Sequence, residues 1–395
     1  MIIFLGLMYS NKSITYCNKY AKNGIQYAPH LFQSNLIQGL VSNEQNVAVL
    51  NIPPMGSFPI NSKKLFLTKE SWGNNNVQIP YINLPIIKKL MQKTALKTEI
   101  KKIIHSCQNE EISIIAYSPY IPFLEVLRWV KIKYPRIKTN LIVTDCIPGR
   151  EDMDKYMTPK AKKDGDRIVK LAKCVDTFTF LSKHLATALE IGEKPYVLTE
   201  CICNENQELS TVNEKSNNVC LYAGGVNEEY GIVMLAEAFV EMTNAELWIC
   251  GNGNAVEKIK SIAVQKTNIK YFGFLSQCEL QDLRNKCDFL INPRMPTGTY
   301  TKYSFPSKTA EYMVSGKPVI MYKLEGIPND YDEFLNYITA KNSLELKCEL
   351  EKIFSSNYLE LTKKSLKARE FMLNNKTSII QAKNILNLIW SNSGK

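Results

Sequence analysis

The residue types best suited to chemistry lie in one short segment of the C-terminal half. Lys308 and Glu311 are three residues apart, between Pro306 and Gly316. Proline suits the first turn of a helix and glycine suits the residue after its end, so the pattern predicts a helix over residues 305–315. The first turn of a helix has unpaired backbone N–H groups and a partial positive charge, which suit a phosphate. Lys308 would add a full charge there.

Local chemistry leaves two interpretations of this segment open. In the first, Lys308 binds a phosphate and the Glu311 carboxylate accepts hydrogen bonds from the hydroxyls of a sugar. In the second, the two side chains share one face of an ordinary surface helix and pair with each other, which is worth about 0.2–0.5 kcal/mol. Neighbouring segments are needed to choose between them.

Two apolar runs nearby end in glycines. One leads into Gly224-Gly225 and Tyr230, and the other leads into Gly251-Asn-Gly253. A strand that runs into glycines lets the backbone approach a phosphate or sugar closely, although a plain tight turn has the same pattern. A third apolar run ends at Arg294, whose guanidinium can present two parallel donors to a pyrophosphate.

In the N-terminal half, two short apolar runs end at Tyr117 and Asp145. In open α/β sheets the ligand site lies at the carboxyl ends of the strands, so both residues are candidates for a binding site. Asp145 could orient or deprotonate an acceptor hydroxyl. A carboxylate that caps the following turn is the alternative.

Length and composition indicate a globular protein with two domains. The chain has 395 residues, of which 45% are hydrophobic and 22% charged, and a net charge of +11. The charge favours an anionic partner such as nucleotide phosphates or lipid head groups. Nucleic acid is not expected, because no motif combines aromatic and basic residues.

Cysteine and histidine usage argues against disulfides and metal. The eleven cysteines include no Cys-x-x-Cys pair, which indicates a reducing, cytoplasmic environment. Only three histidines are present, so a multi-histidine metal site is not expected. The pairs Asp152-Met-Asp154 and Asp164-Gly-Asp166 lie in a polar segment rather than after a strand, and we expect no metal there either.

The α/β alternation starts twice, at Ile2 and again at Val219. We therefore expect a Rossmann-like domain over residues 1–203, a polar linker over 204–218 and a second Rossmann-like domain over 219–375. Residues 376–395 have apolar positions at helical spacing. No stretch approaches the ~20 apolar residues of a membrane helix, and residues 1–8 do not have the pattern of a signal peptide.

Residues 85–107 form a predicted helix rich in lysine. Apolar residues such as Ile86, Leu90 and Ile100 alternate with six lysines. A basic amphipathic helix can lie on an anionic membrane surface, here the cytoplasmic face of the inner membrane. The alternative is a solvated helix that packs its apolar residues on its own domain.

The run Ser304-Phe305-Pro306-Ser307-Lys308, continuing through Glu311 to Gly316-Lys-Pro-Val-Ile, resembles the donor-binding segment of family 4 glycosyltransferases. The resemblance is to the subgroup that assembles capsules, exopolysaccharides and lipopolysaccharides. It implies the GT-B architecture, in which two Rossmann-like domains face a central cleft. It also implies that the last helix crosses back to the first domain.

By this resemblance the reaction is transfer of a hexose-type sugar, with retention of configuration and no essential metal. The donor is a nucleotide-sugar, with a UDP-sugar favoured, and the acceptor is an oligosaccharide or a lipid-linked saccharide. Arg294 and Lys308 would stabilise the leaving diphosphate, with Asp145 as a third catalytic candidate. The implied donor-binding residues are Gly224, Gly225, Tyr230, Gly251, Gly253, Tyr303, Ser304, Phe305, Pro306, Ser307 and Glu311.

Two departures from the family pattern leave alternatives open. Tyr303 replaces a glutamate that contacts the donor sugar in many members, and Gly225 and Tyr230 stand where many have a basic residue. A nucleotide-sugar epimerase of the same architecture would have similar residues. A non-catalytic scaffold of a polysaccharide assembly complex would explain the departures.

Overall fold

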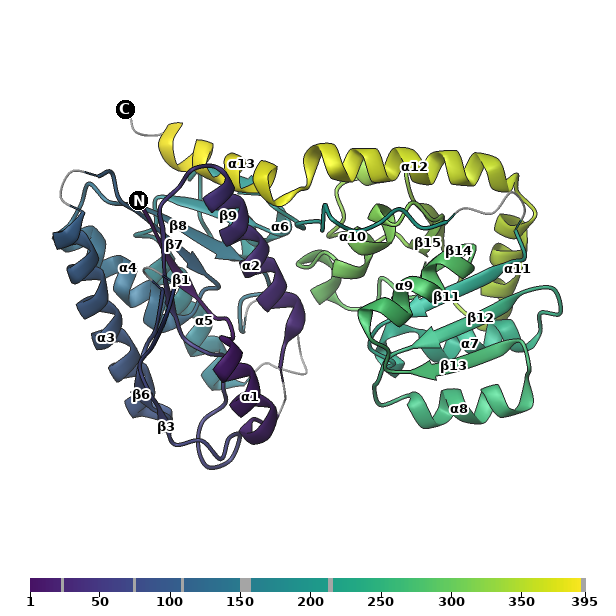
Figure 1. The fold of residues 1–395 in the computed structure, drawn as a ribbon, viewed down its shortest axis with the longest axis horizontal. Coiled ribbons are helices and arrows are strands. Elements are labelled where there is room, and N and C mark those ends of the chain that lie inside the picture. Colours follow the sequence, from purple (N-terminus) through teal and green to yellow (C-terminus); the bar gives the residue numbers. More distant parts are fainter. Residues whose placement is uncertain (23–24, 74–75, 108–109, 150–157, 212–215, 392–395) are drawn as a thin grey trace. The chain divides into compact units, whose positions relative to one another are not determined.

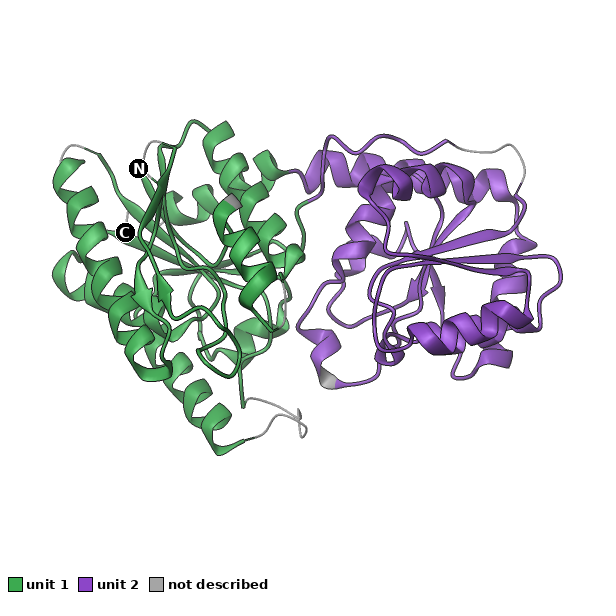
Figure 2. Cartoon of the chain, turned by 60° about the horizontal axis from the view of Figure 1, so that its bottom comes forward, with its two compact units in different colours: residues 1–202, 378–395 green, residues 203–377 purple. Residues whose placement is uncertain are grey.

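The computed structural model describes residues 1–22, 25–73, 76–107, 110–149, 158–211 and 216–391. The chain forms two compact units (Figure 2). Unit 1 consists of Met1–Ile202 together with Ser378–Lys395, and unit 2 consists of Cys203–Thr377. The backbone therefore passes from one unit to the other twice.

Unit 1 contains the following elements (Figure 1): β1 Ile2–Gly6, α1 Asn11–Tyr20, α2 Tyr27–Ser42, β2 Val47–Asn51, β3 Phe66–Leu67, β4 Glu70–Trp72, β5 Asn76–Gln78, β6 Tyr81–Ile82, α3 Pro85–Ser106, β7 Ser113–Tyr117, α4 Ile121–Lys133, β8 Lys138–Val143, α5 Pro159–Ala172, β9 Thr177–Phe180, α6 His184–Ala188, β10 Tyr196–Leu198 and α13 Ser378–Ser391. Among the described residues, its main sheet has the order β10-β9-β8-β7-β1-β2-β5-β4. The strands are parallel except at the edge, where β4 runs antiparallel to β5.

Helices cover both faces of this sheet, which explains why its central strands are almost entirely buried. One face packs on α2 and α13 through a core that includes Phe4, Leu36, Ile115 and Ile385. Helices α3, α4 and α5 lie on the other side of the sheet (Figure 1). The last helix thus belongs to unit 1, as the expected crossing back requires. It approaches α2 so closely that a Cβ atom at Gly39 would lie 2.0 Å from the backbone oxygen of Ser378.

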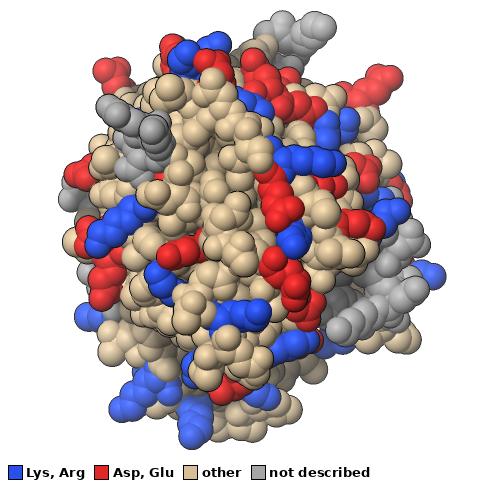
Figure 3. Space-filling model, turned by 90° about the vertical axis from the view of Figure 1, so that its right-hand side faces the viewer, with Lys and Arg blue, Asp and Glu red and all other residues tan. Residues whose placement is uncertain are grey.

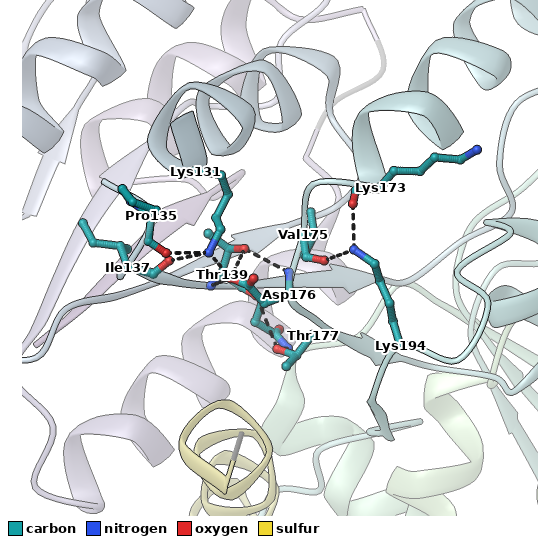
Figure 4. A network of polar contacts seen from close by, with 10 residues as sticks. Lys131, Pro135, Ile137, Thr139, Lys173, Val175, Asp176, Thr177 and Lys194 are labelled. Atoms are coloured by element: carbon teal, nitrogen blue, oxygen red, sulfur yellow. Dashed lines mark hydrogen bonds and ion pairs between the residues drawn. The ribbon is translucent and has the colours of Figure 1, made fainter. Parts of the chain in front are cut away.

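A polar network joins the amino-terminal ends of β8 and β9 (Figure 4). The Asp176 carboxylate accepts hydrogen bonds from the backbone N–H and the hydroxyl of Thr139, and it forms an ion pair with the Lys131 ammonium at 2.9 Å. Lys131 also donates to the backbone oxygens of Pro135 and Ile137. The network lies at the end of the sheet opposite to the expected ligand site, so we assign it to stability.

Unit 2 contains β11 Val219–Ala223, η2 Glu228–Tyr230, α7 Ile232–Val240, β12 Glu246–Cys250, α8 Val256–Gln265, β13 Ile269–Gly273, α9 Gln277–Lys286, β14 Phe289–Asn292, η3 Thr299–Lys302, α10 Ser307–Val314, β15 Val319–Tyr322, η4 Asn329–Tyr331, β16 Asn336–Ile338, α11 Ser343–Phe354 and α12 Tyr358–Asn375. In the described part of this unit the strands form one sheet in the order β13-β12-β11-β14-β15-β16, and all neighbours are parallel. This is the strand order of a Rossmann fold.

The helix predicted in the Lys308 segment is present as α10, two residues shorter at its start than expected. It ends at a glycine with positive φ, Gly316 at 78°, as the sequence predicted. Directly after it, the Lys317 side chain is fully buried and donates to the backbone oxygens of Asn285 and Cys287. Before β11, Gln207 and Ser210 are also buried in unit 2, where Gln207 donates to the backbone oxygen of Glu311.

Helix α3 begins at the predicted residue and ends one residue earlier than predicted, but the predicted apolar face is partly wrong. Ile86 is 85% exposed and Leu90 is 59% exposed, whereas Gln92, Leu96 and Ile100 are buried. Gln92 can be buried because its side-chain oxygen accepts a hydrogen bond from Tyr120 at 2.7 Å. The amino-terminal half of α3 therefore presents apolar side chains to the surface.

Candidate functional site

The candidate site of unit 2 lies where the order of its strands reverses. The chain builds the sheet outward from β11 to β13, then returns to place β14 on the other side of β11. In open α/β sheets the crevice at such a point, outside the carboxyl ends of the strands, is where ligands bind. Gly224 follows β11 and Arg294 follows β14, so both candidates flank this crevice.

Gly224 and Lys308 are in direct contact across this crevice. A Cβ atom built on Gly224 would lie 1.7 Å from Nζ of Lys308 and 1.9 Å from its Cε. A side chain at position 224 would therefore occupy the space that the lysine fills. The glycine is needed here for space, since its backbone conformation is not among those with positive φ.

The Lys308 ammonium carries a charge that no contact from the described residues balances. It lies 5.8 Å from the centre of the Tyr222 ring, and among the described residues it has no hydrogen-bond or ion-pair partner. Burial lowers the pKa of Lys308 from 10.5, and the charge of Arg284 lowers it further, although Glu311 acts in the opposite sense. A desolvated cation without a partner is costly, so the site is prepared for an anion.

Arg294 lies between two tyrosine rings. Its guanidinium carbon is 5.5 Å from the centre of the Tyr230 ring and 4.9 Å from that of Tyr300. Its Nε is buried and has no hydrogen-bond partner among the described residues. Stacking on aromatic faces holds the guanidinium in place without neutralising it.

Tyr222 connects the two cations. Its ring lies under Lys308, and its hydroxyl donates a 2.6 Å hydrogen bond to the backbone oxygen of Gly225. Burial raises the pKa of Tyr222 above its ordinary value, and its neighbours Tyr230 and Arg294 influence it electrostatically. Tyr222 therefore stays neutral, and its ring lies beneath the Lys308 ammonium.

Helix α10 is fixed to the end of β11 by Tyr312. The fully buried hydroxyl of Tyr312 accepts a hydrogen bond from the backbone N–H of Ala223 at 3.0 Å. At the other end of the helix, the backbone N–H groups of Ser307 and Lys308 have no acceptor among the described residues. This arrangement holds the start of α10, with its partial positive charge, beside the glycine loop.

Glu311 pairs with Arg284 rather than with Lys308. Nη2 of Arg284, a buried residue of α9, donates to Oε2 of Glu311 at 3.2 Å. The alternative of a Lys308–Glu311 surface pair is therefore wrong. The Glu311 side chain is 47% exposed, and its second carboxylate oxygen has no partner among the described residues, so it can still accept hydrogen bonds from a ligand.

The loop after β12 packs tightly against the loop after β11. Gly251 has a φ of 127°, and a Cβ atom there would lie 1.8 Å from the backbone oxygen of Gly224. A Cβ atom at Gly253 would lie 2.1 Å from the backbone oxygen of Val226. These glycines thus support the site by allowing two backbones to approach. The structure gives Gly251 a packing reason in addition to the predicted ligand contact.

Two of the predicted donor-binding side chains point into unit 2. Tyr303 is 1% exposed and Phe305 is 6% exposed, and the Phe305 ring packs on Tyr331 at 5.2 Å. Both rings therefore take part in the packing of unit 2, and their contact with a donor stays a prediction. Pro306 is the N-cap of α10 and is also buried, while Ser304 is partly exposed and Ser307 is exposed.

Sequence reasoning missed three residues of this site. Arg284 orients Glu311, Tyr222 underlies Lys308, and Tyr300 covers one face of Arg294. Tyr222 directly precedes Ala223 and the glycine pair at the end of a predicted strand, so its position was a usable signal. Arg284 and Tyr300 carry no local pattern that separates them from surface residues.

Unit 1 has a candidate site of its own at the carboxyl ends of β7 and β8. Asp145 borders a cavity of about 260 Å³ whose lining also includes Lys89, Ser118, Tyr120, Cys146 and Asp164. The Asp145 carboxylate accepts a hydrogen bond from the backbone N–H of Cys146 at 2.8 Å, which is the capping contact of the alternative interpretation. Tyr117 is buried, and this raises its pKa to about 12.

Asp152 and Asp154 lie outside the described residues. The described ranges contain no group of three or more His, Cys, Asp or Glu side chains that could hold a metal ion. Within the same ranges, every helix is too short or too polar to span a bilayer.

Comparison with known proteins identifies the fold. Over 99% of both chains, the structure is similar to sucrose-phosphate synthase from Thermosynechococcus elongatus, with a TM-score of 0.65 and 13% identity. It is likewise similar, over 99% of both chains, to Anabaena HepE in complex with UDP, with a TM-score of 0.61 and 14% identity. The lipopolysaccharide outer core galactosyltransferase WaaB has a TM-score of 0.62 and 13% identity, again over 99% of both chains. The predicted GT-B architecture with two Rossmann-like domains is therefore confirmed.

The sequence comparisons concern unit 2. No curated protein matches the chain. Residues 217–351, which include the glycine loops, Arg294, Lys308 and Glu311, match the family of glycosyl transferases group 1. Together with the GT-B fold, the group 1 pattern of unit 2 supports a glycosyltransferase.

Proposed function

We propose that this chain transfers a hexose-type sugar from a nucleoside diphosphate sugar to a saccharide acceptor, with retention of configuration. The observation that carries the proposal is the Lys308 ammonium, which is desolvated, has no protein partner among the described residues and fills a space that Gly224 leaves open. A diphosphate is the ligand that such a cation fits best, with Arg294 as its second contact.

In the proposed reaction the bond between the sugar and the diphosphate breaks, and a new bond forms to an acceptor hydroxyl. Negative charge grows on the departing diphosphate. Lys308, Arg294 and the start of α10 would stabilise it as preorganised positive groups, which is often the largest contribution to catalysis. Glu311, held by Arg284, would accept hydrogen bonds from the ribose hydroxyls.

We favour a UDP-sugar as donor and a saccharide, free or lipid-linked, as acceptor. HepE, one of the structural neighbours, contains UDP. WaaB acts in the outer core of lipopolysaccharide, which supports a role in the synthesis of bacterial surface polysaccharides and a place in the family 4 subgroup. The cavity beside Asp145 is the proposed acceptor site, where Asp145 would orient the hydroxyl.

For a lipid-linked acceptor, we also propose that the protein binds to the cytoplasmic face of a membrane through α3. Ile86 and Leu90 on α3 are exposed, and Lys89 lies between them in the sequence. Apolar side chains among lysines suit the interface of an anionic bilayer. The test is co-sedimentation with anionic vesicles, which an Ile86→Ser/Leu90→Ser variant should reduce without loss of nucleotide binding.

The proposed donor site is tested by calorimetry with UDP, GDP and CMP, followed by turnover assays. We expect selective binding of UDP and loss of turnover by at least roughly tenfold in Lys308→Ala, because one preorganised charged contact is worth that much. Lys258→Ala, an exposed lysine on α8, is the matched control. Near-normal turnover in Lys308→Ala would contradict the assignment of Lys308 to the donor site.

The products separate the alternatives. Release of UDP that requires a saccharide acceptor indicates a transferase, whereas interconversion of UDP-sugars without acceptor indicates an epimerase. A scaffold would give neither reaction.

A further inference from the structure

A second pocket lies on unit 1, between helices α3, α4 and α5. It has a volume of about 480 Å³ and is lined by Lys93, Lys97, Glu125, Arg128, Trp129, Ile132, Arg167, Lys170 and Leu171. It shares no lining residue with the cavity beside Asp145. We call it the α3–α4–α5 pocket.

The charges of this pocket are unbalanced. Its lining has five cationic side chains and a single carboxylate, Glu125. Glu125 is already shared, because it forms ion pairs with Lys93 at 3.2 Å and with Arg167. Lys97, Arg128 and Lys170 are left without an ion-pair or hydrogen-bond partner among the described residues.

An aromatic side chain supports the cations. The Lys97 and Lys101 ammonium groups lie 5.2 and 5.7 Å from the centre of the Trp129 ring. Trp129 is itself held edge to face against Tyr134, with the ring centres 5.7 Å apart. The lysine chains are therefore positioned by contact with an indole rather than by a carboxylate.

The cations also repel one another. Desolvation lowers the pKa of Lys97, and the charges of Lys93 and Lys101 lower it further, while Glu125 acts in the opposite sense. An anion placed among these groups would relieve this repulsion.

A different face of the molecule has a more mixed distribution of charge. On the face drawn in Figure 3, Lys and Arg side chains are interspersed with Asp and Glu. Exposed lysines such as Lys260 and Lys363 pair with a glutamate three residues away on the same helix. The excess of cations in the α3–α4–α5 pocket thus differs from the mixed charges on that face.

We propose that the α3–α4–α5 pocket binds the phosphate group of an anionic ligand. Arg128 supplies a planar fork that matches two phosphate oxygens, and Lys97 and Lys170 supply further charge. Trp129 provides an apolar wall for the rest of the ligand. This site is separate from the proposed donor site, and the proposal does not depend on sugar transfer. A lipid head group and a soluble phosphate ester both carry the required chemistry.

The first experiment is a pyrophosphate titration of the full chain in a Lys308→Ala background, which weakens the donor site. Calorimetry gives the affinity, and the fluorescence of Trp129 reports the location, with Trp129→Phe as the control for the signal. We expect binding that weakens as salt increases. Lys97→Glu/Arg128→Glu should lower the affinity at least roughly tenfold, because charge-assisted contacts are lost.

Matched variants separate a site from general charge effects. Lys258→Glu/Lys367→Glu makes the same change in net charge at two exposed lysines of unit 2 and should leave the affinity within about twofold, because both lie outside the pocket. Lys170→Glu, at an exposed position, is a second test if the double variant does not fold. Equal losses in the pocket and control variants, or no change in the Trp129 signal, would overturn the proposal.

Vesicles then identify the source of the phosphate. The chain is sedimented with phosphatidylglycerol vesicles and, as a control, with pure phosphatidylcholine vesicles. If it binds only the phosphatidylglycerol vesicles, and pyrophosphate prevents this binding, the ligand of the pocket is a lipid head group. Pyrophosphate binding without such co-sedimentation would show a soluble phosphate ester. Because turnover and UDP binding are measured separately, failure of this site and failure of the proposed transferase give different results.

Discussion

At the scale of residues, Gly224 and Lys308 act as one feature although they lie far apart in the sequence. Gly224→Ala should displace the end of the lysine chain, since the added methyl would lie 1.7 Å from Nζ. A flexible side chain can move at little cost, so the melting temperature should change little while UDP affinity falls at least roughly tenfold. Gly225→Ala, whose nearest contact would be 3.1 Å, should have a weaker effect.

The two changes should also be non-additive. Gly224→Ala and Lys308→Ala remove the same contact, so the double variant should bind UDP about as weakly as Lys308→Ala alone. A double variant that shows the full sum of the two losses would argue that Gly224 acts in another way.

Lys308 should lower the stability of the protein while it supports function. Burial lowers its pKa, so the unfolded chain binds this proton more tightly than the folded chain does. Below the folded pKa the charged ammonium destabilises unit 2, and the penalty disappears as pH rises towards 10.5. Lys308→Met should therefore raise the melting temperature at pH 7–8, with a gain that fades towards pH 10.5, whereas turnover falls.

Thermal unfolding at several pH values, with and without UDP, checks this prediction. Lys258→Met is the control, because that lysine is exposed. If Lys308→Met is less stable than the native chain at pH 7.5 without ligand, the ammonium has a stabilising partner and the argument for an anion-binding site at Lys308 fails.

At the scale of elements, the close packing of α13 on α2 should reverse the usual effect of a glycine-to-alanine substitution in a helix. Replacing glycine by alanine inside a helix usually stabilises it by up to about 1 kcal/mol. At Gly39 the new methyl would meet the backbone of Ser378 at 2.0 Å, so we expect Gly39→Ala to destabilise unit 1 by about 1–3 kcal/mol. Calorimetric unfolding measures this, with Val41→Ala on the exposed side of the same helix as the control. A raised melting temperature would contradict the close packing.

The elements that carry the site were predictable because their signals are local. Proline, lysine and glycine spacing predicts α10, and apolar runs that end in glycine predict β11 and β12. The exposed face of α3 was not predictable in the same way. Periodicity places Ile86 and Leu90 on one side of the helix, but only tertiary packing decides whether that side is covered.

Contacts between distant segments were the least predictable part of the site. The partner of Glu311 is Arg284 on α9, whereas sequence spacing points to the neighbouring Lys308. Similarly, nothing in the motif around Tyr303 and Phe305 indicates that both rings are buried. Such choices depend on how α9, α10 and η4 pack, which no local pattern records.

At the scale of the whole molecule, the two units should respond separately to ligand and to truncation. UDP binds only the native state in our proposal, so it should raise the unfolding temperature of unit 2 and leave that of unit 1 unchanged.

Removing residues 378–395 should strongly lower the unfolding temperature of unit 1, since Ile385 and Ile389 are fully buried and each contributes about 1.5–3 kcal/mol.

Differential scanning calorimetry of the native and truncated chains measures both effects. The UDP-induced shift in the truncated chain is the internal control, because the residues of the proposed donor site are all in unit 2. Transitions that always move together would show that the units unfold cooperatively.

Unit 1 is built from two segments that are distant in the sequence, which has a consequence for synthesis on the ribosome. Residues 203–377 must be made before α13 can cover the apolar side of α2 and its sheet. At a typical rate of 5–20 residues per second this takes roughly ten to thirty-five seconds. Unit 2 can fold during that interval, whereas the nascent first unit keeps Leu36 and Leu40 partly uncovered and is open to chaperones.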